Sequence, residues 1–296
     1  MSKSDYLLAE KKLEEKFSIG SKLLINKKKY TIINSGKPRP MNGSGECKTD
    51  LYFECVDKEN KKKEIKISIK LNNYEFLGNK TTLDTAKELF GPNAGDLINQ
   101  STKGIKDKFL NSQLIKWNKK DNNIRIILGW KLEIFNNSSH KLKSIPELSL
   151  DQKIKILNGS NSSINKINSI VNRKIIKGSG KPDFILIINK NFDNLTNLDP
   201  SEILSNLQKI ENYAKKLNIN FGFTAINYRK GPDKWDGDRA LAVYIKWKYL
   251  NKKLLSKICF DRPLEHRANQ FANTIRDELK NLSNVNINQK NYINYF

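Results

Sequence analysis

Residues 43–70, GSGECKTDLYFECVDKENKKKEIKISIK, contain the pattern that decides the fold of this 296-residue chain. Two runs rich in β-branched and aromatic residues, 49–57 and 63–71, are separated by the polar sequence KENKK. Such runs joined by a short polar turn are typical of an antiparallel β-hairpin. We therefore predict a hairpin whose turn is centred near residue 60.

The second strand of this hairpin presents two different faces, because side chains alternate along a strand. Its isoleucines are expected to face the core, and its polar residues are expected to face a cleft or solvent: Glu64, Lys66, Ser68 and Lys70. With the turn near residue 60, Asp50 lies beside Lys70 and diagonal to Ser68, whereas Glu64 pairs near the turn. A carboxylate and an ammonium group are thus expected together on rigid strands.

A carboxylate and a lysine in this arrangement suit the hydrolysis of a phosphodiester bond. A hard divalent cation binds oxygen ligands, and the Asp50 carboxylate and the Ile69 carbonyl could supply two of them. The cation would lower the pKa of a bound water and neutralise charge on the scissile phosphate. The Lys70 ammonium could orient that water or offset charge in the transition state.

The composition favours a polyanionic partner. The chain has 54 Lys and Arg against 31 Asp and Glu, a formal net charge of +23, and nucleic acid is the first candidate partner. An alternative explanation of the positive charge is an AT-rich genome, because the chain is rich in Lys, Asn and Ile, the amino acids that AT-rich codons favour. Its 3 cysteines and 2 histidines argue against a disulfide framework, a zinc ribbon and nucleases built on histidine–metal motifs.

The sequence has no feature of a membrane or secreted protein. No stretch approaches the roughly 18–20 uncharged apolar residues of a membrane span. The N-terminus contains carboxylates throughout and lacks the apolar region of a signal peptide. We therefore expect no membrane partner and a cytoplasmic location.

The remaining pattern predicts a mixed α/β fold. Helices are expected at about 2–17, 81–90, 200–217 and 263–282, and further strands at 124–135, 182–189, 220–228 and 239–249. The Asn/Ser-rich segment 158–169 is typical of a linker or a long surface loop. This predicts a core at 1–157 and a C-terminal α/β region at 158–296, unless the two pack as one domain.

Asp50, followed 18 and 20 residues later by Ser68-Ile69-Lys70, resembles the PD-(D/E)XK nuclease superfamily, and the lead-in GSGECKTD resembles type II restriction endonucleases. The resemblance implies a restriction-endonuclease-like core, in which helices flank a central mixed β-sheet, with a C-terminal α/β extension. It also implies Mg²⁺ dependence, cleavage of DNA and action as a homodimer, because two strands are cut at symmetric sites.

The sequence departs from this family at Ser68, which stands where the acid of the (D/E)-x-K motif is expected. Some members of the family carry Ser there and recruit a carboxylate from the following helix. Asp84, with Glu88 one turn on, is therefore the first candidate for the displaced acid and a metal ligand. Glu46, just before the strand, is the second candidate.

Two further acids remain open under the resemblance. The shifted triplet Glu64-Ile65-Lys66 fits the letters of the motif better, but the hairpin register places it far from Asp50. A glutamate of the N-terminal helix, Glu14 or Glu15, could add a metal ligand, as it does in related nucleases.

The second half of the chain contains one further candidate for DNA contact. Residues 227–239, NYRKGPDKWDGDR, join two predicted strands and mix basic, aromatic and acidic side chains. Basic residues interleaved with aromatics suit phosphate contact and base stacking. The expected DNA-binding residues are Tyr228, Arg229, Lys230, Lys234 and Arg239, together with Lys48 of the lead-in. The alternative is a structured hairpin loop with internal salt bridges.

The function predicted from the sequence is a metal-dependent DNA endonuclease, with type II restriction as the best subclass. A homing, phage-encoded or repair nuclease shares the core and stays open, as does an RNA-directed nuclease. A non-catalytic nucleic-acid-binding protein that retains the fold is the alternative from another class, and the Ser68 departure is its best support.

Overall fold

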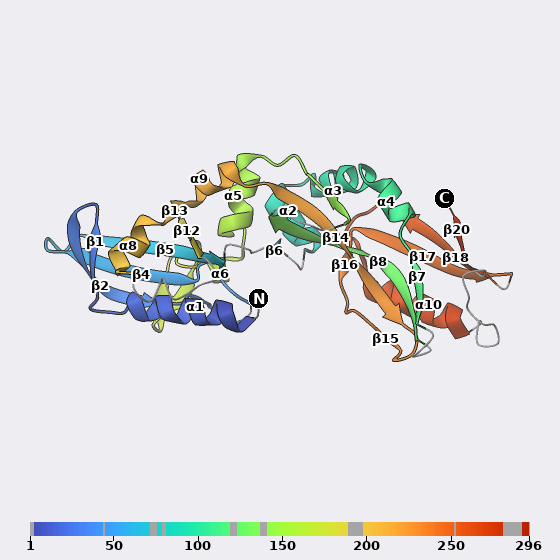
Figure 1. The fold of residues 1–296 in the computed structure, drawn as a ribbon, viewed down its shortest axis with the longest axis horizontal. Coiled ribbons are helices and arrows are strands. Elements are labelled where there is room, and N and C mark those ends of the chain that lie inside the picture. The colour runs from blue at the N-terminus through green and yellow to red at the C-terminus, as the bar shows by residue number, and fades with distance from the viewer. Residues whose placement is uncertain are drawn as a thin grey trace. The chain divides into compact units, whose positions relative to one another are not determined.

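The computed structural model describes residues 3–43, 45–71, 76–78, 81–118, 123–136, 141–188, 198–251, 253–280 and 292–295. These residues form a mixed α/β fold, as the sequence predicts (Figure 1). The chain divides into two compact units, one of residues 1–74 with 149–217 and one of residues 75–148 with 218–296. The division differs from the expected break at 157/158, since the first unit is made of two separate stretches of chain.

The first unit is built on a six-stranded mixed sheet with the order β1-β2-β4-β5-β12-β13. Strands β4 and β5 form the predicted hairpin, and β12 lies parallel to β5. The bounds are β1 Lys22–Ile25, β2 Lys28–Gly36, β4 Leu51–Asp57, β5 Lys62–Leu71, β12 Phe184–Ile188 and β13 Gln208–Lys209. Parallel neighbours need a crossover connection, and here the crossover includes the whole stretch 72–183.

The register of the β4–β5 hairpin differs from the predicted one by two residues. Leu51 lies opposite Ile67 and Val56 opposite Lys62, so that the turn is centred near residue 59. Asn60 takes a left-handed φ of 60°, which closes the turn. One residue beyond the last pair, Asp50 therefore faces Ser68 instead of Lys70, and Glu64 lies opposite Glu54 instead of near Val56.

Helices cover the sheet of the first unit on both faces (Figure 1). Helix α1, Lys3–Lys16, places Ala9 and Leu13 on the sheet, and Phe17 follows at the same spacing. The Phe17 and Phe53 rings stack with centroids 4.9 Å apart. The other helices of this unit are α5 Leu150–Asn158, α6 Ile164–Ile167, α8 Pro200–Ser205 and α9 Ile210–Lys216. Of these, α8 contributes the buried Ile203 to the same core, and α5 packs against α9.

Residues 158–169, expected as a linker or a long surface loop, lie inside the first unit. They contain α6 and lead into a small three-stranded sheet, with β3 Arg39–Pro40, β10 Ser169–Val171 and β11 Lys174–Ile176. Packing here is tight, since a Cβ at Gly180 would lie 1.7 Å from the Lys166 carbonyl oxygen. The Asn/Ser-rich composition therefore reflects turns within this unit and does not mark a domain boundary.

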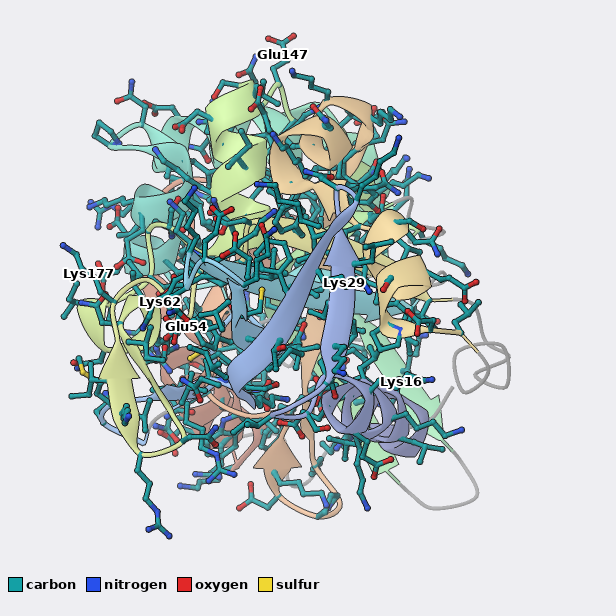
Figure 2. All side chains as sticks on the ribbon, turned by 90° about the vertical axis from the view of Figure 1, so that its left-hand side faces the viewer. Lys16, Lys29, Glu54, Lys62, Glu147 and Lys177 are labelled. Carbon is teal, nitrogen blue, oxygen red and sulfur yellow. The ribbon has the colours of Figure 1, made fainter. Side chains whose placement is uncertain are left out.

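The positive charge on the first unit is spread over several elements. Figure 2 shows Lys16, Lys29, Lys62 and Lys177 around the end of the sheet that carries the β1–β2 hairpin. Lys62 pairs with Glu54 at 3.0 Å, and the Lys16 ammonium donates to the Leu198 carbonyl at 2.7 Å. Because part of this charge is used within the fold, charge alone does not mark a binding face.

The second unit is built on a nine-stranded sheet around the long antiparallel pair β8 and β14. The expected strands 124–135 and 220–228 and the helix at 81–90 are confirmed, whereas the expected strand 239–249 is divided into two strands of different sheets and the expected helix 263–282 begins only at Ala268. The strands of the nine-stranded sheet are β6 Phe76–Gly78, β7 Ile115–Asn118, β8 Asn123–Asn136, β9 Lys143–Ser144, β14 Ile219–Arg229, β15 Lys234–Trp235, β17 Val243–Leu250, β18 Lys253–Cys259 and β20 Tyr292–Tyr295. A separate two-stranded sheet pairs β16 Ala240–Leu241 with β19 His266–Arg267. The helices are α2 Leu83–Phe90, α3 Ala94–Lys103, α4 Lys106–Leu110 and α10 Ala268–Lys280.

Strands β8 and β14 of the second unit approach each other closely at one glycine. Gly222 lies under the Phe135 ring of the neighbouring strand, where a Cβ would meet the ring at 2.0 Å, so β8 and β14 pack closely at this point. None of the helices described is long and apolar enough to cross a membrane.

The stacked pair of Phe17 and Phe53 predicts a large loss of stability on truncation. Phe17→Ala should cost about 3–5 kcal/mol of unfolding free energy, because it removes a fully buried ring and leaves a cavity. Ile19→Ala, in a side chain that is 61% exposed, should change it by less than about 0.5 kcal/mol. Urea denaturation followed by circular dichroism measures both, and similar losses for the two variants would contradict the assigned core.

Candidate active site

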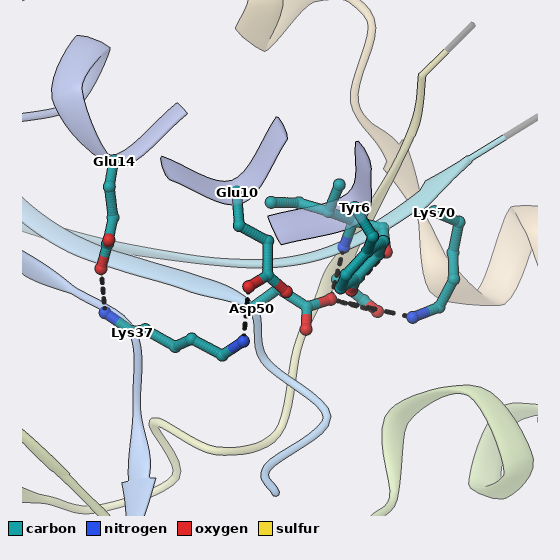
Figure 3. A network of polar contacts seen from close by, with 8 residues as sticks. Tyr6, Glu10, Glu14, Lys37, Asp50 and Lys70 are labelled. Atoms are coloured by element: carbon teal, nitrogen blue, oxygen red, sulfur yellow. Dashed lines mark hydrogen bonds and ion pairs between the residues drawn. The ribbon is translucent and has the colours of Figure 1, made fainter. Parts of the chain in front are cut away.

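Asp50 lies at the entry to β4 and is held against β5. Its backbone amide donates to the Ile67 carbonyl at 2.9 Å, which extends the strand ladder by one residue. Its Oδ2 accepts hydrogen bonds from the Ile69 amide at 2.7 Å and the Ser68 hydroxyl at 3.2 Å. The Lys70 ammonium lies 3.7 Å from the same oxygen (Figure 3). The structure thus brings together Asp50, Ser68, Ile69 and Lys70, as the sequence predicts.

A second carboxylate, that of Glu10, enters this cluster from helix α1. Glu10 is only 7% exposed, and Tyr6, one turn earlier, donates its hydroxyl to the Ile69 carbonyl at 3.1 Å. The resemblance to related nucleases predicts a ligand from this helix at Glu14 or Glu15. Glu14 instead accepts a hydrogen bond from the Lys37 amide at 2.9 Å, and Glu15 is exposed.

The sequence contained a signal for Glu10. Tyr6, Leu13 and Phe17 mark the core-facing stripe of α1, and a residue four positions after Tyr6 falls on the same stripe. Glu10 is the acidic residue at that position. A carboxylate on an apolar helix face has to find partners in the interior, and this makes it a better candidate than an acid on the solvent face.

Lys37, directly after β2, is the counter-ion of Glu10. Its ammonium lies 2.5 Å from Glu10 Oε2, while its backbone amide holds Glu14 (Figure 3). Burial lowers the pKa of Lys37, but the hydrogen bond to Glu10 and the charges of Glu10 and Asp50 outweigh it and raise the pKa above its usual range. The ammonium is therefore retained at neutral pH.

Burial and proximity to Asp50 also affect Glu10 and Tyr6. Burial raises the pKa of Glu10, and the Asp50 charge adds to this effect while the bond from Lys37 opposes it. Burial raises the pKa of the Tyr6 hydroxyl, and the charges of Asp50 and Glu10 raise it further, so Tyr6 stays a hydrogen-bond donor. Two carboxylates, those of Asp50 and Glu10, thus lie close enough to affect each other, and each has a lysine as its ion-pair partner.

The residues present fit a hard divalent cation such as Mg²⁺. Glu10 Oε1 is buried and has no hydrogen-bond partner among the described residues, so this carboxylate oxygen could still accept a hydrogen bond or bind a cation. The described ranges contain no group of three or more His, Cys, Asp or Glu suited to a metal ion. The groups here that could hold a cation are Glu10, Asp50 and the Ile69 carbonyl, with water completing its shell, as is common for Mg²⁺.

Lys48, predicted as a DNA contact, is a largely enclosed neighbour of the cluster. Its side chain packs on Gly159, where a Cβ would lie 2.7 Å from Lys48 Cγ. Burial, together with the positive charges of Lys70 and Lys166, lowers its pKa to about 8 against the opposing effect of Asp50. The half-buried Lys48 therefore adds positive charge near Lys70.

The two candidates for the displaced acid are placed differently. Asp84 lies exposed in the first turn of α2, a helix of the second unit. An acid in the first turn complements the helix dipole, which accounts for it locally. Its neighbour Glu88 is exposed on the same helix. Glu46 is exposed on the loop before Asp50, and its charge contributes to the raised pKa of Lys37.

The polar side chains of the shifted triplet Glu64-Ile65-Lys66 contact residues other than Asp50. The Tyr52 hydroxyl donates to Glu64 at 3.0 Å, and Lys66 pairs with Asp183 at 3.0 Å. Its placement away from Asp50 agrees with the sequence analysis.

The segment 227–239 is a structured hairpin loop with internal salt bridges, the alternative left open above. Tyr228 is 3% exposed and donates to Asp233 at 2.6 Å, so its ring is not available for base stacking. Arg229 pairs with Asp236, and Arg276 with Asp233 at 2.8 Å. Of the remaining predicted DNA contacts, Lys230 and Lys234 are exposed and Arg239 is half-buried.

Comparisons with known proteins found no match. This holds for models of protein families, for curated proteins and for solved structures.

The buried ammonium of Lys48 predicts a pH-dependent gain of stability on Lys48→Met. Unfolding restores its pKa to about 10.4, so between about pH 8 and that value the unfolded chain binds more protons and the wild type becomes more stable as pH rises. The variant lacks this penalty. Its gain in melting temperature over the wild type should therefore be largest at pH 7 and shrink by pH 10. Lys177→Met, at an exposed position, is the control, and a gain independent of pH would contradict the assignment.

Proposed function

We propose that this protein is a Mg²⁺-dependent DNA endonuclease with a restriction-endonuclease-like core, and that its closest functional class is type II restriction. The observation that carries the proposal is the cluster of Asp50, Lys70 and Glu10 around the Ile69 carbonyl. A phosphodiesterase needs hard oxygen ligands beside a fixed positive charge, and the cluster offers both.

The architecture of the first unit supports this proposal. The β4–β5 hairpin lies in a mixed sheet with β12 parallel to β5, and helices cover both faces of that sheet. A hairpin of this kind between helices is what the resemblance to the PD-(D/E)XK superfamily implies. The sheet also explains why the site residues are rigid, since three of them lie on β5, a strand paired on both sides.

The Ser68 departure does not remove the second carboxylate. Ser68 is fully buried and donates to Asp50, so it orients the first acid. Glu10 then supplies the carboxylate that a (D/E)-x-K motif would place on β5. This arrangement favours an active enzyme over a binding protein that has lost its chemistry.

The chain's own residues have separable roles in the proposed reaction. Asp50 is fixed by the Ile69 amide and by Ser68, and the Tyr6 hydroxyl donates to the Ile69 carbonyl. When bound, Mg²⁺ would supply charge neutralisation at the phosphate and a water of lowered pKa. Lys70 would hold positive charge at the attacked phosphate, since its ammonium lies within 3.7 Å of Asp50.

The first test is cleavage of plasmid and phage DNA in Mg²⁺ and in EDTA. Asp50→Asn and Lys70→Met should each lower the cleavage rate at least about 100-fold, because they remove a cation ligand and the adjacent positive charge. Glu64→Gln and Lys66→Met are matched controls on the same strand and should cleave within about threefold of the wild type. EDTA should abolish cleavage. Intact DNA with the wild type on several templates, in Mn²⁺ as well, would instead favour the non-catalytic binding protein.

A second test identifies the displaced acid. Glu10→Gln should lower cleavage at least about 100-fold, whereas Asp84→Asn and Glu46→Gln should each stay within about threefold of the wild type. Glutamine keeps the shape of Glu10 but removes the charge that a cation needs. Melting curves of each variant separate loss of activity from loss of folding. Loss of cleavage in Asp84→Asn with retention in Glu10→Gln would transfer the role to Asp84.

A further inference from the structure

The second unit contains a hollow of about 760 Å³ on the face of its sheet near β7, β8 and β14. Figure 1 shows these strands with helix α4. The segment after α4 and residues 141–142 complete its walls. The lining residues are Lys108, Asn111, Ser112, Gln113, Lys116, Arg125, Ile127, Trp130, Lys141, Leu142, Phe223, Thr224, Ala225 and Asn227. Four of these are cations and none is an acid.

A row of like charges crosses the sheet at this hollow. Lys116 on β7 lies directly opposite Arg125 on β8, and Arg125 lies opposite Arg229 on β14. Like charges at opposite positions of paired strands destabilise a sheet. Arg229 is neutralised by Asp236, but Lys116 and Arg125 have no ion pair within the part of the chain that the structure describes. The sheet therefore keeps two adjacent cations that would be stabilised by an external anion.

The floor and walls of the hollow are rigid and carry hydrogen-bonding groups. The buried rings of Trp130 and Phe223 lie edge-on to Phe109, with centroids 5.0 and 5.4 Å from it. The Asn227 side-chain amide donates to Asp236 at 2.8 Å, which fixes the orientation of that side chain. Side-chain amides of this kind can read the edges of bases, and exposed lysines can contact phosphates.

We propose that this hollow is a DNA-binding site of the second unit, in which Lys108, Lys116, Arg125 and Lys141 contact backbone phosphates and the amide side chains face the bases. The inference rests on the proposed function, which makes DNA the substrate of the cluster in the first unit. A polyanion satisfies several separate cations at once and releases their counterions, whereas a single small anion satisfies only one or two.

The test measures binding of a short fluorescent DNA duplex in EDTA, so that no cleavage occurs. Lys116→Gln with Arg125→Gln should weaken binding at least about tenfold. The pair should also reduce the slope of log affinity against log salt by roughly 2, because each cation that no longer neutralises a phosphate lowers the slope by about 1. The matched control is Lys253→Gln with Lys257→Gln, which removes two exposed cations from β18 of the same unit. The control should keep both the affinity and the slope close to those of the wild type.

Several results would overturn the inference. One is an equal loss of DNA affinity in the Lys116/Arg125 and Lys253/Lys257 double variants, which would indicate a general effect of charge. Another is an affinity of the Lys116/Arg125 double variant equal to that of the wild type. Absence of duplex binding by the wild type would do the same. If a free deoxynucleoside monophosphate competes for the site as well as unlabelled duplex does, the ligand of the hollow is a nucleotide and not polymeric DNA.

This assay and the cleavage assay fail independently. Loss of binding in the Lys116/Arg125 variant without any cleavage by the wild type would retain the binding site and reject the endonuclease. Cleavage by the wild type together with unchanged binding by the variant would do the reverse.

Discussion

The carboxylate of Asp50 accepts hydrogen bonds from the Ile69 amide and the Ser68 hydroxyl, and the rest of the candidate site depends on this contact. It exists only in the observed register, in which Asp50 faces Ser68 one residue beyond the last pair of β4 and β5. A shift by one residue would turn Ser68 and Lys70 into the core. The same register brings the Lys70 ammonium to Asp50 and leaves the Ile69 carbonyl to the Tyr6 hydroxyl.

The second constraint is the cost of placing two carboxylates in a largely enclosed space. Burial and the charge of Asp50 both raise the pKa of Glu10, and one lysine, Lys37, opposes them. Such a group stays in place only if other contacts fix its helix. Ala9, Leu13 and Phe17 do so, because their burial attaches α1 to the sheet on the stripe that carries Glu10. The core thus stabilises an arrangement of two carboxylates that is unfavourable by itself.

Local patterns predicted the hairpin, its two faces and the grouping of Asp50, Ser68 and Lys70. They missed the register, because it depends on where the turn closes, and Asn60 closes it one residue earlier than assumed. They missed Glu10 in favour of Glu14 or Glu15; helix phase excludes the exposed Glu15, but Glu14 lies one turn after Glu10 on the same side of the helix, so phase alone does not separate these two. The domain division failed for a nonlocal reason, since β12 pairs with β5 across more than a hundred residues of chain. No local composition records such a pairing.

A net charge of +23 could reflect codon bias, so the partners of the cations carry more information than their number. In the loop at 227–239, Arg229 is predicted to contact DNA, but it forms an ion pair with Asp236. Lys116 and Arg125 lie side by side on paired strands, and neither has an acidic partner among the described residues. Codon bias adds lysines without regard to their neighbours, but it does not explain an arginine kept opposite a lysine in a hollow lined by no acid. Such an arrangement is unfavourable for the folded chain alone, and an anionic ligand would relieve it.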